Sequence, residues 1–541
     1  MINLLNYLPV RFESISKLFE GLDSIQIILL ITVLCIIISY VFCDPGGKRR
    51  QFVQHVEKIP GPVAFPLIGN AFSLLFPPDE IFYWLEEVYK KWGDISRFWV
   101  FRSPKIFVNS YDIAMQLLTR KNFLLKSEEF EPLAPIAKYS LPGATPQVHP
   151  IRRKMLGPGF SRQTVEKSFE IFNKHARALC HGLGDLADRN VVFNALTQTG
   201  LCSYMIGCET AFGHEIMRNL TETDYRNQMY SWHTLLVNTV NRSFQPWFKS
   251  DYIYNLTQPG KQNLECFERI NSFGENAIAS RRSTRNSWDT SSKAKIDKSL
   301  NPLDAFKSSM NIPLKSHCYL DLLLDLEEKK ELTKEDVLHE LNLFIVAGYD
   351  TTGTTAAWTL HLLASNPECQ RKAHEELQTI FGNRKGTDLQ VTVEDIKQMK
   401  FLDGCIKEAL RLFPVLPWLL RRTDEEIRLN DGTILPEGVD IPINTFLIQR
   451  NPTFFPEPDK FQPERHFPGS TSNIKAMLPF GAGPRICPGM LFGMHELKII
   501  LAHLLLSYSW ESLDDPKKMK CVFHGVLLPK DGINVKICRV R

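Results

Sequence analysis

The sequence predicts a mainly α-helical protein with small β-sheets, preceded by one transmembrane helix. A long helical pattern begins after Thr333, with Asp336 as a weak capping-box partner, and runs to about Ser365. Alternation typical of strands is confined to short stretches such as 427–429, 441–446 and 535–540. Helices should therefore dominate the fold, and the sheets should be small.

The transmembrane helix is predicted over residues 25–43, a run without charged side chains that is just long enough to cross a bilayer. A buried core helix and a signal peptide are the alternatives, but no clear small-residue cleavage site follows the run. Lys48, Arg49 and Arg50 come next, and the positive-inside rule then places everything after the helix in the cytoplasm.

The rest of the chain is predicted to form one domain that follows a hinge segment. Residues 44–70 are first basic and then proline-rich, which predicts a stiff lead-in. The expected division is a short lumenal segment over 1–24, the anchor over 25–43, this hinge, and a catalytic domain over 71–541. Residues 280–317 are polar and serine-rich without apolar periodicity, which predicts a solvated loop between helices.

The composition is that of an ordinary globular protein, with 44% hydrophobic and 23% charged residues among 541. A net charge of +4 is too small to indicate a nucleic-acid partner. The 12 cysteines show no paired metal-type spacing, which favours a reduced compartment over a disulfide framework.

Phe480 to Gly489 read FGAGPRICPG, and this segment surrounds Cys487 with groups suited to hold a thiolate against a haem iron. Its glycines, Gly481 among them, allow close backbone approach to a flat macrocycle. Apolar residues at helical spacing follow directly, so Cys487 should lie beside a helix N-terminus that favours a thiolate. Arg485 offers a cation suited to a haem propionate. A buried inert thiol is the usual state of one cysteine, but the other fixed positions around it argue against that alternative.

The pattern F-x-x-G-x-R-x-C-x-G resembles the haem-binding signature of the cytochrome P450 superfamily at every fixed position. The resemblance covers essentially residue 60 onward and is strongest over residues 333–489. It implies the cytochrome P450 fold, with Cys487 as the axial ligand of the iron and with Phe480, Gly481 and Arg485 at the haem. A thiolate ligand favours O–O cleavage, so the chain is expected to be an oxidase.

Residues 347–352 read AGYDTT within the long, otherwise apolar helix. Burying an acid and an alcohol there costs free energy unless they have a function or a partner. Gly348 is a poor helix former and Thr351 can bond back to a carbonyl, so the helix could open locally and admit oxygen or water. Asp350 and Thr351 would then deliver protons, as general acids do. A polar face turned to solvent is the alternative. The resemblance favours catalysis, because A-G-x-D-T-T is that family's oxygen-activation pattern, and it places Ala347 and Gly348 at the haem.

Glu408 and Arg411 share one helix face, which alone indicates no more than a solvated ion pair. Arg465 follows at the distance at which the resembled family places a second arginine. The resemblance therefore implies a buried triad whose bidentate pairs satisfy one another. We expect the triad to serve structure and haem-pocket assembly. His466 replaces the family's usual phenylalanine and should matter little to the triad.

Haem has two propionates, so cations must converge on one edge of its pocket. The resemblance assigns Arg421 and Arg153 to that edge. His149 stands where the family has tryptophan; it could donate a hydrogen bond to a propionate, but it lacks the same stacking area. Arg152 and Lys154 could form a basic surface for an acidic redox partner, and a solvated charge run fits them equally well.

Residues 208–213 (CETAFG) and 152–160 (RRKMLGPGF) look like the branch of the family that contains microsomal fatty-acid ω-hydroxylases. That branch often has glutamate where Ala347 stands, and the glutamate can form an ester to the haem. Ala347 cannot, so haem b should bind noncovalently, and strict selectivity for the terminal carbon does not follow.

The resemblance implies a monooxygenase that inserts one oxygen atom from O2 into a lipophilic substrate, with fatty acids or related lipids as the expected class. Residues near 130–139 and 235–244 would contribute to its pocket, although plain core is the alternative. No G-x-G-x-x-G nucleotide site appears, so NADPH–cytochrome P450 reductase would supply electrons, with cytochrome b5 as an optional second partner. The expected location is the endoplasmic reticulum membrane, as a single-pass protein with a cytoplasmic catalytic domain.

Two other functions stay open at this point. A haem-thiolate isomerase or lyase of lipid peroxides would need neither a reductase nor a proton relay, and the intact pair of Asp350 and Thr351 argues against it. A noncatalytic haem sensor of a gas or lipid is also disfavoured by this pair, although less strongly, because a recently inactivated enzyme would keep both residues.

Overall fold

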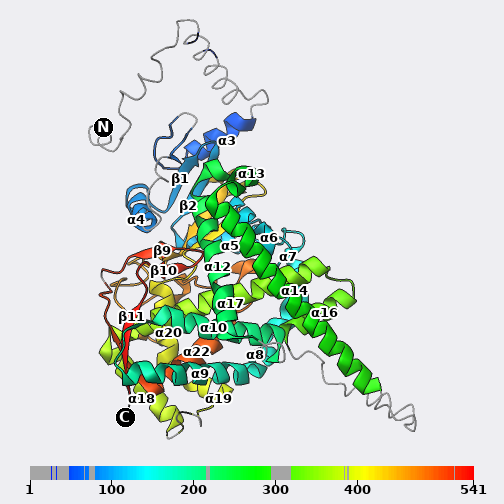
Figure 1. Cartoon of the computed structure of the whole chain (residues 1–541). Helices are drawn as coiled ribbons and strands as arrows, with labels where there is room; N and C mark the ends of the chain where they lie inside the picture. The colour runs from blue at the N-terminus through cyan, green and yellow to red at the C-terminus, as the bar shows by residue number, and fades with distance from the viewer. Residues whose placement is uncertain are drawn as a thin grey trace, which may run out of the picture.

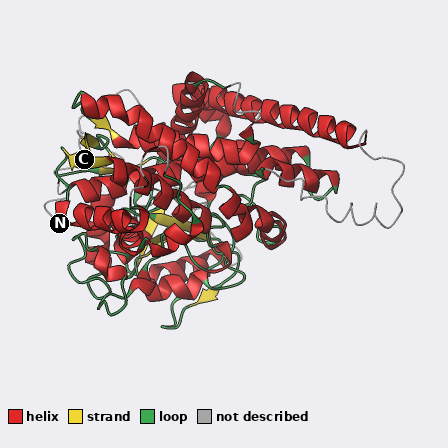
Figure 2. Cartoon of the chain, turned by 90° about the horizontal axis from the view of Figure 1, so that it is seen from below, coloured by secondary structure: helices red, strands yellow, loops and turns green. Residues whose placement is uncertain are grey.

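The computed structural model describes residues 48–65, 68–71, 80–214, 220–293, 318–382, 384, 386, 389–516 and 518–540, together with Gln26 and Thr32. The predicted segment 1–24 and nearly all of the predicted anchor over 25–43 therefore lie outside the described residues, as does the part of the predicted loop over 294–317. Within the described part helices dominate and strands are short, which confirms the predicted fold class (Figure 2).

The helical elements have the following bounds. In the first half of the chain they are α3 (Lys48–Glu57), α4 (Ile81–Trp92), α5 (Tyr111–Leu118), η3 (Glu128–Leu133), α6 (Ala134–Ala137), α7 (His149–Leu156), η4 (Gly157–Phe160), α8 (Arg162–Lys167), α9 (Phe169–Asp188), α10 (Ala195–Phe212), α12 (Glu222–Ser243), η5 (Pro246–Phe248), α13 (Asp251–Asn255) and α14 (Gln258–Lys293). In the second half they are α16 (Tyr319–Glu328), α17 (Lys334–Ala364), α18 (Pro367–Phe381), α19 (Val393–Gln398), α20 (Lys400–Leu412), α21 (Thr445–Ile448), η7 (Pro463–His466), η8 (Ile474–Ala476), η9 (Gly483–Arg485) and α22 (Met490–Ser507).

The strands of the described residues form four small sheets. Their bounds are β1 (Ile95–Val100), β2 (Ser103–Val108), β3 (Phe193–Asn194), β4 (Trp418–Arg422), β5 (Ile427–Arg428), β6 (Ile434–Leu435), β7 (Asp440–Asn444), β8 (Tyr508–Ser512), β9 (Cys521–Phe523), β10 (Leu527–Pro529) and β11 (Asn534–Arg539). The largest sheet has the order β1-β2-β7-β4, in which only the β2–β7 pair is parallel. The others are β3-β11-β8, β9-β10 and β5-β6, so the three predicted strands correspond to β5, β7 and β11.

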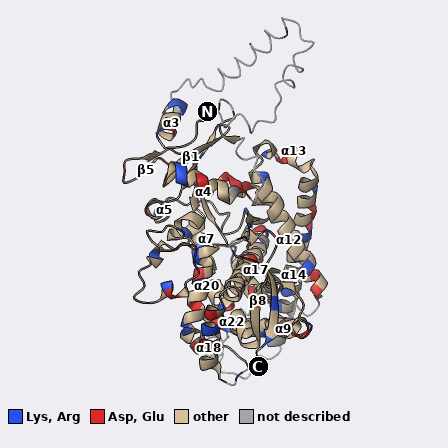
Figure 3. Cartoon of the chain, turned by 90° about the vertical axis from the view of Figure 1, so that its left-hand side faces the viewer, with Lys and Arg blue, Asp and Glu red and all other residues tan. Residues whose placement is uncertain are grey.

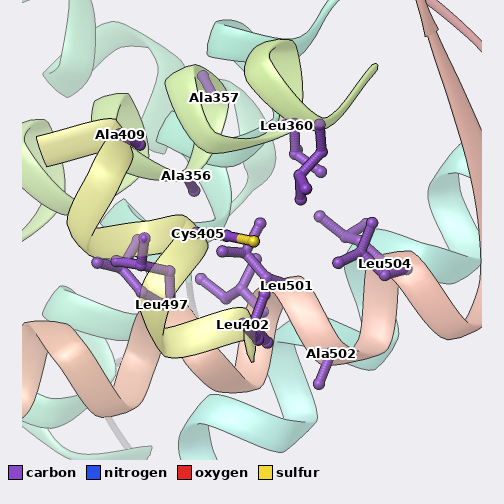
Figure 4. Close-up of a cluster of buried hydrophobic side chains, with 14 of the residues drawn as sticks. Ala356, Ala357, Leu360, Leu402, Cys405, Ala409, Leu497, Leu501, Ala502 and Leu504 are labelled. Atoms are coloured by element: carbon purple, nitrogen blue, oxygen red, sulfur yellow. The ribbon is translucent and has the colours of Figure 1, made fainter. Parts of the chain in front are cut away.

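Helix α17 crosses the middle of the body and packs along α10 (Figure 1). A Cβ on Gly353 of α17 would lie 2.7 Å from the Cα of Gly200 on α10, so the two helices can approach this closely because residue 353 is glycine. Helix α17 also contributes Ala356 and Ala357 to a cluster with leucines of α20 and α22 (Figure 4). The segment predicted to be catalytic thus lies on a helix that is packed into the core.

Helix α22 is, among the described residues, the one that has the length and apolar composition of a membrane span. Most of its side chains, Leu501 and Leu504 among them, are buried in the core of the domain. Its apolar sequence is therefore explained by packing against α9, α17 and α18.

The ends of α17 match the predicted ones. The Thr333 hydroxyl accepts a hydrogen bond from the Asp336 N–H at 3.1 Å, and the Asp336 carboxylate accepts one from the Thr333 N–H at 2.8 Å. This reciprocal pair satisfies two backbone donors that a helix start leaves free. At the other end Ser365 is the C-cap, directly before Asn366-Pro367.

The predicted loop over 280–317 is wrong for its first part, because α14 continues as helix to Lys293. Arg281 on α14 donates two hydrogen bonds to Asp321 of α16, at 2.9 and 2.6 Å, and Arg285 reaches Asp325 on the same helix. This polar segment is held to the neighbouring helix by ion pairs and not by apolar side chains. Its sequence therefore lacks the apolar periodicity by which a helix is predicted.

Removing the N-cap of α17 should weaken the domain. We expect Thr333→Ala to lower the free energy of unfolding by about 1 kcal/mol, because the Asp336 N–H loses its acceptor, the Thr333 hydroxyl. Chemical denaturation followed by circular dichroism measures this. Thr379→Ala on α18 is the control, since that exposed hydroxyl only bonds back to the Glu375 carbonyl. Equal stability of the two variants would contradict the role of the cap.

Candidate active site

Cys487 lies in a tight loop immediately before α22. The Cys487 N–H donates to the Phe480 carbonyl at 3.0 Å, which closes the loop on itself. Gly483 has a φ of 68°, and a Cβ there would lie 1.8 Å from the Leu118 carbonyl oxygen, so only glycine fits. The cysteines of the described residues, Cys487 included, are all free. The loop therefore presents one unpaired sulfur at a fixed position.

The sulfur of Cys487 is placed at the N-terminal end of α22, as predicted. Burial raises the pKa of its thiol, whereas the backbone N–H groups of Gly489 and Met490 donate to the sulfur and lower the pKa, as does the charge of Arg153. The raising effect prevails, so the thiolate depends on further positive charge such as a bound metal ion supplies.

A cavity of about 900 Å³ joins the residues that the sequence singled out. Its wall includes every predicted haem contact and both predicted catalytic residues: Cys487, Arg485, Arg421, Arg153, Phe480, Gly481, Ala347, Gly348, Asp350 and Thr351. The predicted substrate-pocket stretches also reach this cavity, through Phe130, Leu236 and Phe244. Segments more than 300 residues apart in the sequence thus meet around one space.

Basic side chains gather on one part of the cavity wall, and none of them forms an ion pair with a carboxylate in the described chain. They are Lys126, His149, Arg153, Arg421 and Arg485, which we call the cation cluster. Burial lowers the pKa of Arg421 and of Arg485, and for Arg485 the nearby charge of Arg421 lowers it further. Burial and the neighbouring arginines also lower the pKa of Lys126 far below its usual value and that of His149 to about 4.

Several polar atoms of the cation cluster are buried without a hydrogen-bond partner in the described structure: Arg421 Nε, Arg485 Nε and His149 Nδ1. Arg153 donates to the Ile486 carbonyl at 2.8 Å, next to Cys487. Uncompensated buried cations are costly, so this edge of the cavity is complementary to a dianionic group. The two propionates of haem have that charge, and the residues present fit haem.

Asp350 and Thr351 face the same cavity from α17. Burial raises the pKa of Asp350 to about 7, so this carboxyl can both bind and release a proton near neutral pH. The Thr351 hydroxyl donates to the Ala347 carbonyl at 2.7 Å, which is the back-bond expected from the sequence. The local opening expected near Gly348 is absent, because α17 is continuous from Lys334 to Ala364.

Glu408 is fully buried outside the cavity wall and joins the predicted triad. Arg411 donates to it at 2.9 and 2.8 Å, and Arg465 donates at 3.1 Å. Burial raises the pKa of Glu408, but hydrogen bonds from His466 and Arg411 outweigh burial and lower it overall. The expectation that His466 matters little is wrong, because its Nε2 lies 3.0 Å from the Glu408 carboxylate.

Arg152 does not belong to the basic surface that the sequence suggested. Its guanidinium is buried and binds Asp336 of α17 at 2.5 Å, whereas Lys154 is exposed. Adjacent residues of a helix point in directions about 100° apart, so neighbouring charged residues on α7 face different surroundings. Only Lys154 of these two can contact a partner protein.

Sequence reasoning missed several titratable residues of the cavity wall, among them Lys126 and Glu496. Lys126 lies in the stretch 123–130 (FLLKSEEF) and had no motif to mark it. Glu496 of α22 is fully buried, accepts a hydrogen bond from the Ser203 hydroxyl at 2.7 Å, and has its pKa raised by burial to about 8. A lone acid within an apolar helical run was the signal that could have found it.

A mostly helical fold with a buried cysteine, an acid and alcohol on the opposite wall, and a cation cluster for two carboxylates defines a haem-thiolate enzyme. Residues 59–537 match the family model described as Cytochrome P450, so the chain belongs to the cytochrome P450 family and is a P450 monooxygenase.

The relatives extend over nearly the whole chain. Cytochrome P450 4c3 of Drosophila melanogaster is 30% identical, over 98% of this chain and 97% of its own length. Cytochrome P450 4V2 of Rattus norvegicus is 30% identical over 94% of both chains, and cytochrome P450 4c21 of Blattella germanica is 28% identical over 95% of this chain and 99% of its own. These names support a family 4-like enzyme, as the sequence motifs predicted.

Neutralising Glu408 should destabilise the domain strongly. In Glu408→Gln, Arg411 and Arg465 stay buried without a counter-charge, and we expect a loss of about 3–5 kcal/mol in the free energy of unfolding. Denaturant melts followed by tryptophan fluorescence measure this. Glu375→Gln removes an exposed partner of Arg371 on α18 and should leave the melt unchanged. If both variants melt alike, the buried triad does not have the structural role expected of it.

Proposed function

We propose that this monooxygenase inserts one oxygen atom from O2 into a lipophilic substrate, with fatty acids and related lipids as its class. The observation that carries the proposal is the shared cavity, which has Cys487 on one wall, Asp350 and Thr351 on another, and mainly apolar side chains elsewhere. An apolar cavity of about 900 Å³ suits a lipid better than a polar metabolite.

We propose haem b as a noncovalently held cofactor. Cys487 would ligate the iron, Phe480, Gly481, Ala347 and Gly348 would border the macrocycle, and the cation cluster would bind the propionates. Haem, when bound, supplies the iron centre at which O2 is reduced. Ala347 supports noncovalent binding, since its methyl group faces the cavity and cannot form an ester.

The residues of this chain would position the substrate and move protons. The Thr351 hydroxyl is held by the Ala347 carbonyl at 2.7 Å and can pass a proton into the cavity. The Asp350 carboxyl, with its pKa near 7, can resupply it. Electrons would come from NADPH through cytochrome P450 reductase, with cytochrome b5 as an optional second donor, and exposed Lys154 would contribute to docking.

We also propose a single-pass position in the endoplasmic reticulum membrane with the catalytic domain in the cytoplasm. Exposed apolar side chains gather on η5, α13 and the residue after it: Trp247, Tyr252, Ile253 and Leu256. Helix α13 lies at the same end of the molecule as α3, which begins directly after the proposed anchor (Figures 1 and 3). Lys249 and Asp251 beside this surface line the cavity, so a lipid would reach the cavity from the membrane side.

Turnover tests the proposed function. We expect product with one added oxygen from a panel of fatty acids and related lipids, given reductase and NADPH and followed by mass spectrometry. Thr351→Ala should lower product per NADPH by on the order of 10²-fold, because the cavity loses its proton-passing hydroxyl. Thr379→Ala on the surface of α18 is the control and should keep full turnover.

Three results would redirect the proposal. Conversion of lipid hydroperoxides without NADPH would indicate an isomerase or lyase, and haem binding without any turnover would indicate a sensor. A carbon monoxide difference spectrum of the reduced protein that lacks the thiolate-type band, or keeps it in Cys487→Ser, would exclude Cys487 as the ligand.

The pH dependence of turnover should report Asp350. Its raised pKa means that the carboxyl is protonated below about pH 7 and loses its proton above. If it supplies protons, product per NADPH should fall as pH rises through about 7, and Asp350→Asn should remove this limb together with most turnover. Steady-state assays from pH 6 to 9 measure it. A limb that persists unchanged in Asp350→Asn would assign the titration to another group.

A further inference from the structure

An ion pair at the opening of the cavity joins two segments that are 121 residues apart in the sequence. The ammonium of Lys249, which follows η5, donates to Oε2 of Glu128, the first residue of η3, at 2.7 Å. Both side chains line the cavity, and that of Lys249 is 69% exposed. A side chain that borders the cavity and also contacts solvent lies where the cavity opens, so this pair lies at the opening.

Glu128 has a second cationic partner. Nη1 of Arg422 on β4 lies 2.5 Å from Glu128 Oε1, the oxygen that Lys249 does not contact. Burial raises the pKa of Glu128, but the hydrogen bond from Lys249 and the charge of Arg422 outweigh burial and lower it overall, so the carboxylate is ionised at neutral pH. Glu128 therefore keeps one cation if Lys249 turns to another anion.

Lys249 differs from the neighbouring cations of the cavity wall in how it is held. Within the part of the chain that the structure describes, the one carboxylate paired with Lys249 is that of Glu128. Arg242 donates to Asp251 at 2.6 Å and to two backbone carbonyls, and Lys105 lies largely buried between two carboxylates. Lys249 is thus the cation of this group that can exchange its partner with least loss of contacts.

We propose that Lys249 binds the carboxylate of a fatty-acid substrate, and that Glu128 occupies this position until the substrate arrives. The substrate replaces Glu128 on the ammonium, Glu128 stays paired with Arg422, and the hydrocarbon tail enters the apolar part of the cavity. An exposed ion pair contributes little stability, so one carboxylate can replace another there at small cost. The inference rests on the proposed function and names the group that recognises the charged end of the substrate.

Three variants separate recognition of the substrate from a purely structural contact. Lys249→Met keeps an unbranched side chain and removes the charge, whereas Lys249→Arg keeps the charge. Glu128→Gln removes the competing carboxylate charge, and Arg422 then keeps Asp440 at 3.4 Å. Loss of Lys249 and loss of Glu128 break the same ion pair, but the proposed exchange predicts opposite effects on the binding of a fatty acid.

The chain also offers matched controls. Glu131 on the same η3 lines the cavity, is exposed and forms no ion pair in the described structure, so Glu131→Gln removes an equal charge without contacting Lys249. Lys372→Met removes an exposed lysine outside the cavity wall, which pairs with Glu464 at 3.0 Å across two elements. Arg102→Met tests another exposed cation of the cavity wall.

The experiment measures binding to the full-length, haem-loaded enzyme in nanodiscs of phosphatidylcholine, a lipid without net charge. The ligands are dodecanoic acid and 1-dodecanol, which share a chain length and differ in charge. Dissociation constants come from calorimetric titration and from the shift of the Soret band. We expect Lys249→Met to weaken binding of the acid about fivefold and that of the alcohol less than about twofold. Lys249→Arg should stay within about twofold of wild type, and Glu128→Gln should bind the acid about threefold more tightly. Glu131→Gln, Lys372→Met and Arg102→Met should match wild type.

Three results would overturn the inference. Equal weakening of the acid and the alcohol in Lys249→Met, or weaker binding of the acid in Glu128→Gln, would mean that the pair only holds the two segments together. A loss confined to the acid in Arg102→Met, with Lys249→Met unchanged, would place the carboxylate at Arg102. Failure of the proposed function looks different, because the acid would then bind with these variant effects and yet yield no oxygenated product.

Discussion

Buried positive charge that the chain does not neutralise is the constraint on which the active site depends. Arg421 and Arg485 lie in the wall of a largely apolar cavity without a carboxylate partner in the described residues. Such an arrangement is costly until an anion enters, so cofactor binding and completion of the fold are coupled. The same coupling explains why backbone carbonyls hold Arg485, since a carboxylate there would repel the propionate.

The structure contrasts two kinds of buried arginine. Arg411 and Arg465 share Glu408 and are satisfied within the protein, which suits a role in holding α20 against η7. Arg421 and Arg485 of the cation cluster are held only by carbonyls, and each keeps a buried Nε–H without a partner in the described structure. A buried arginine that is paired with a carboxylate of the protein thus has a structural role in this fold. A buried arginine without such a carboxylate is available to bind an anionic ligand.

Sequence reasoning was most successful where the determinants lie within a few residues of each other. The cap at Thr333, the turn before α22 and the back-bond from Thr351 to Ala347 are such cases. It failed where partners come from distant segments. Helix α14 continues past 280 because its arginines bind α16, and Arg152 is buried because Asp336 faces it. His466 joins the triad as a fourth member through Glu408, which lies 58 residues earlier in the sequence.

The sequence by itself determined the ligand loop, the helix that carries Asp350 and Thr351, and the class of chemistry, because each depends on spacing within one short segment. Only the tertiary structure decided which basic side chains line the cavity and which form ion pairs with a carboxylate of the protein. It alone showed Lys126 in the cation cluster and Arg485 held by the carbonyls of the distant segment 141–144. The physical reason is that burial and partners from distant segments determine whether a charged side chain forms an ion pair or stays unpaired. Neither of these can be read from the neighbouring residues in the sequence.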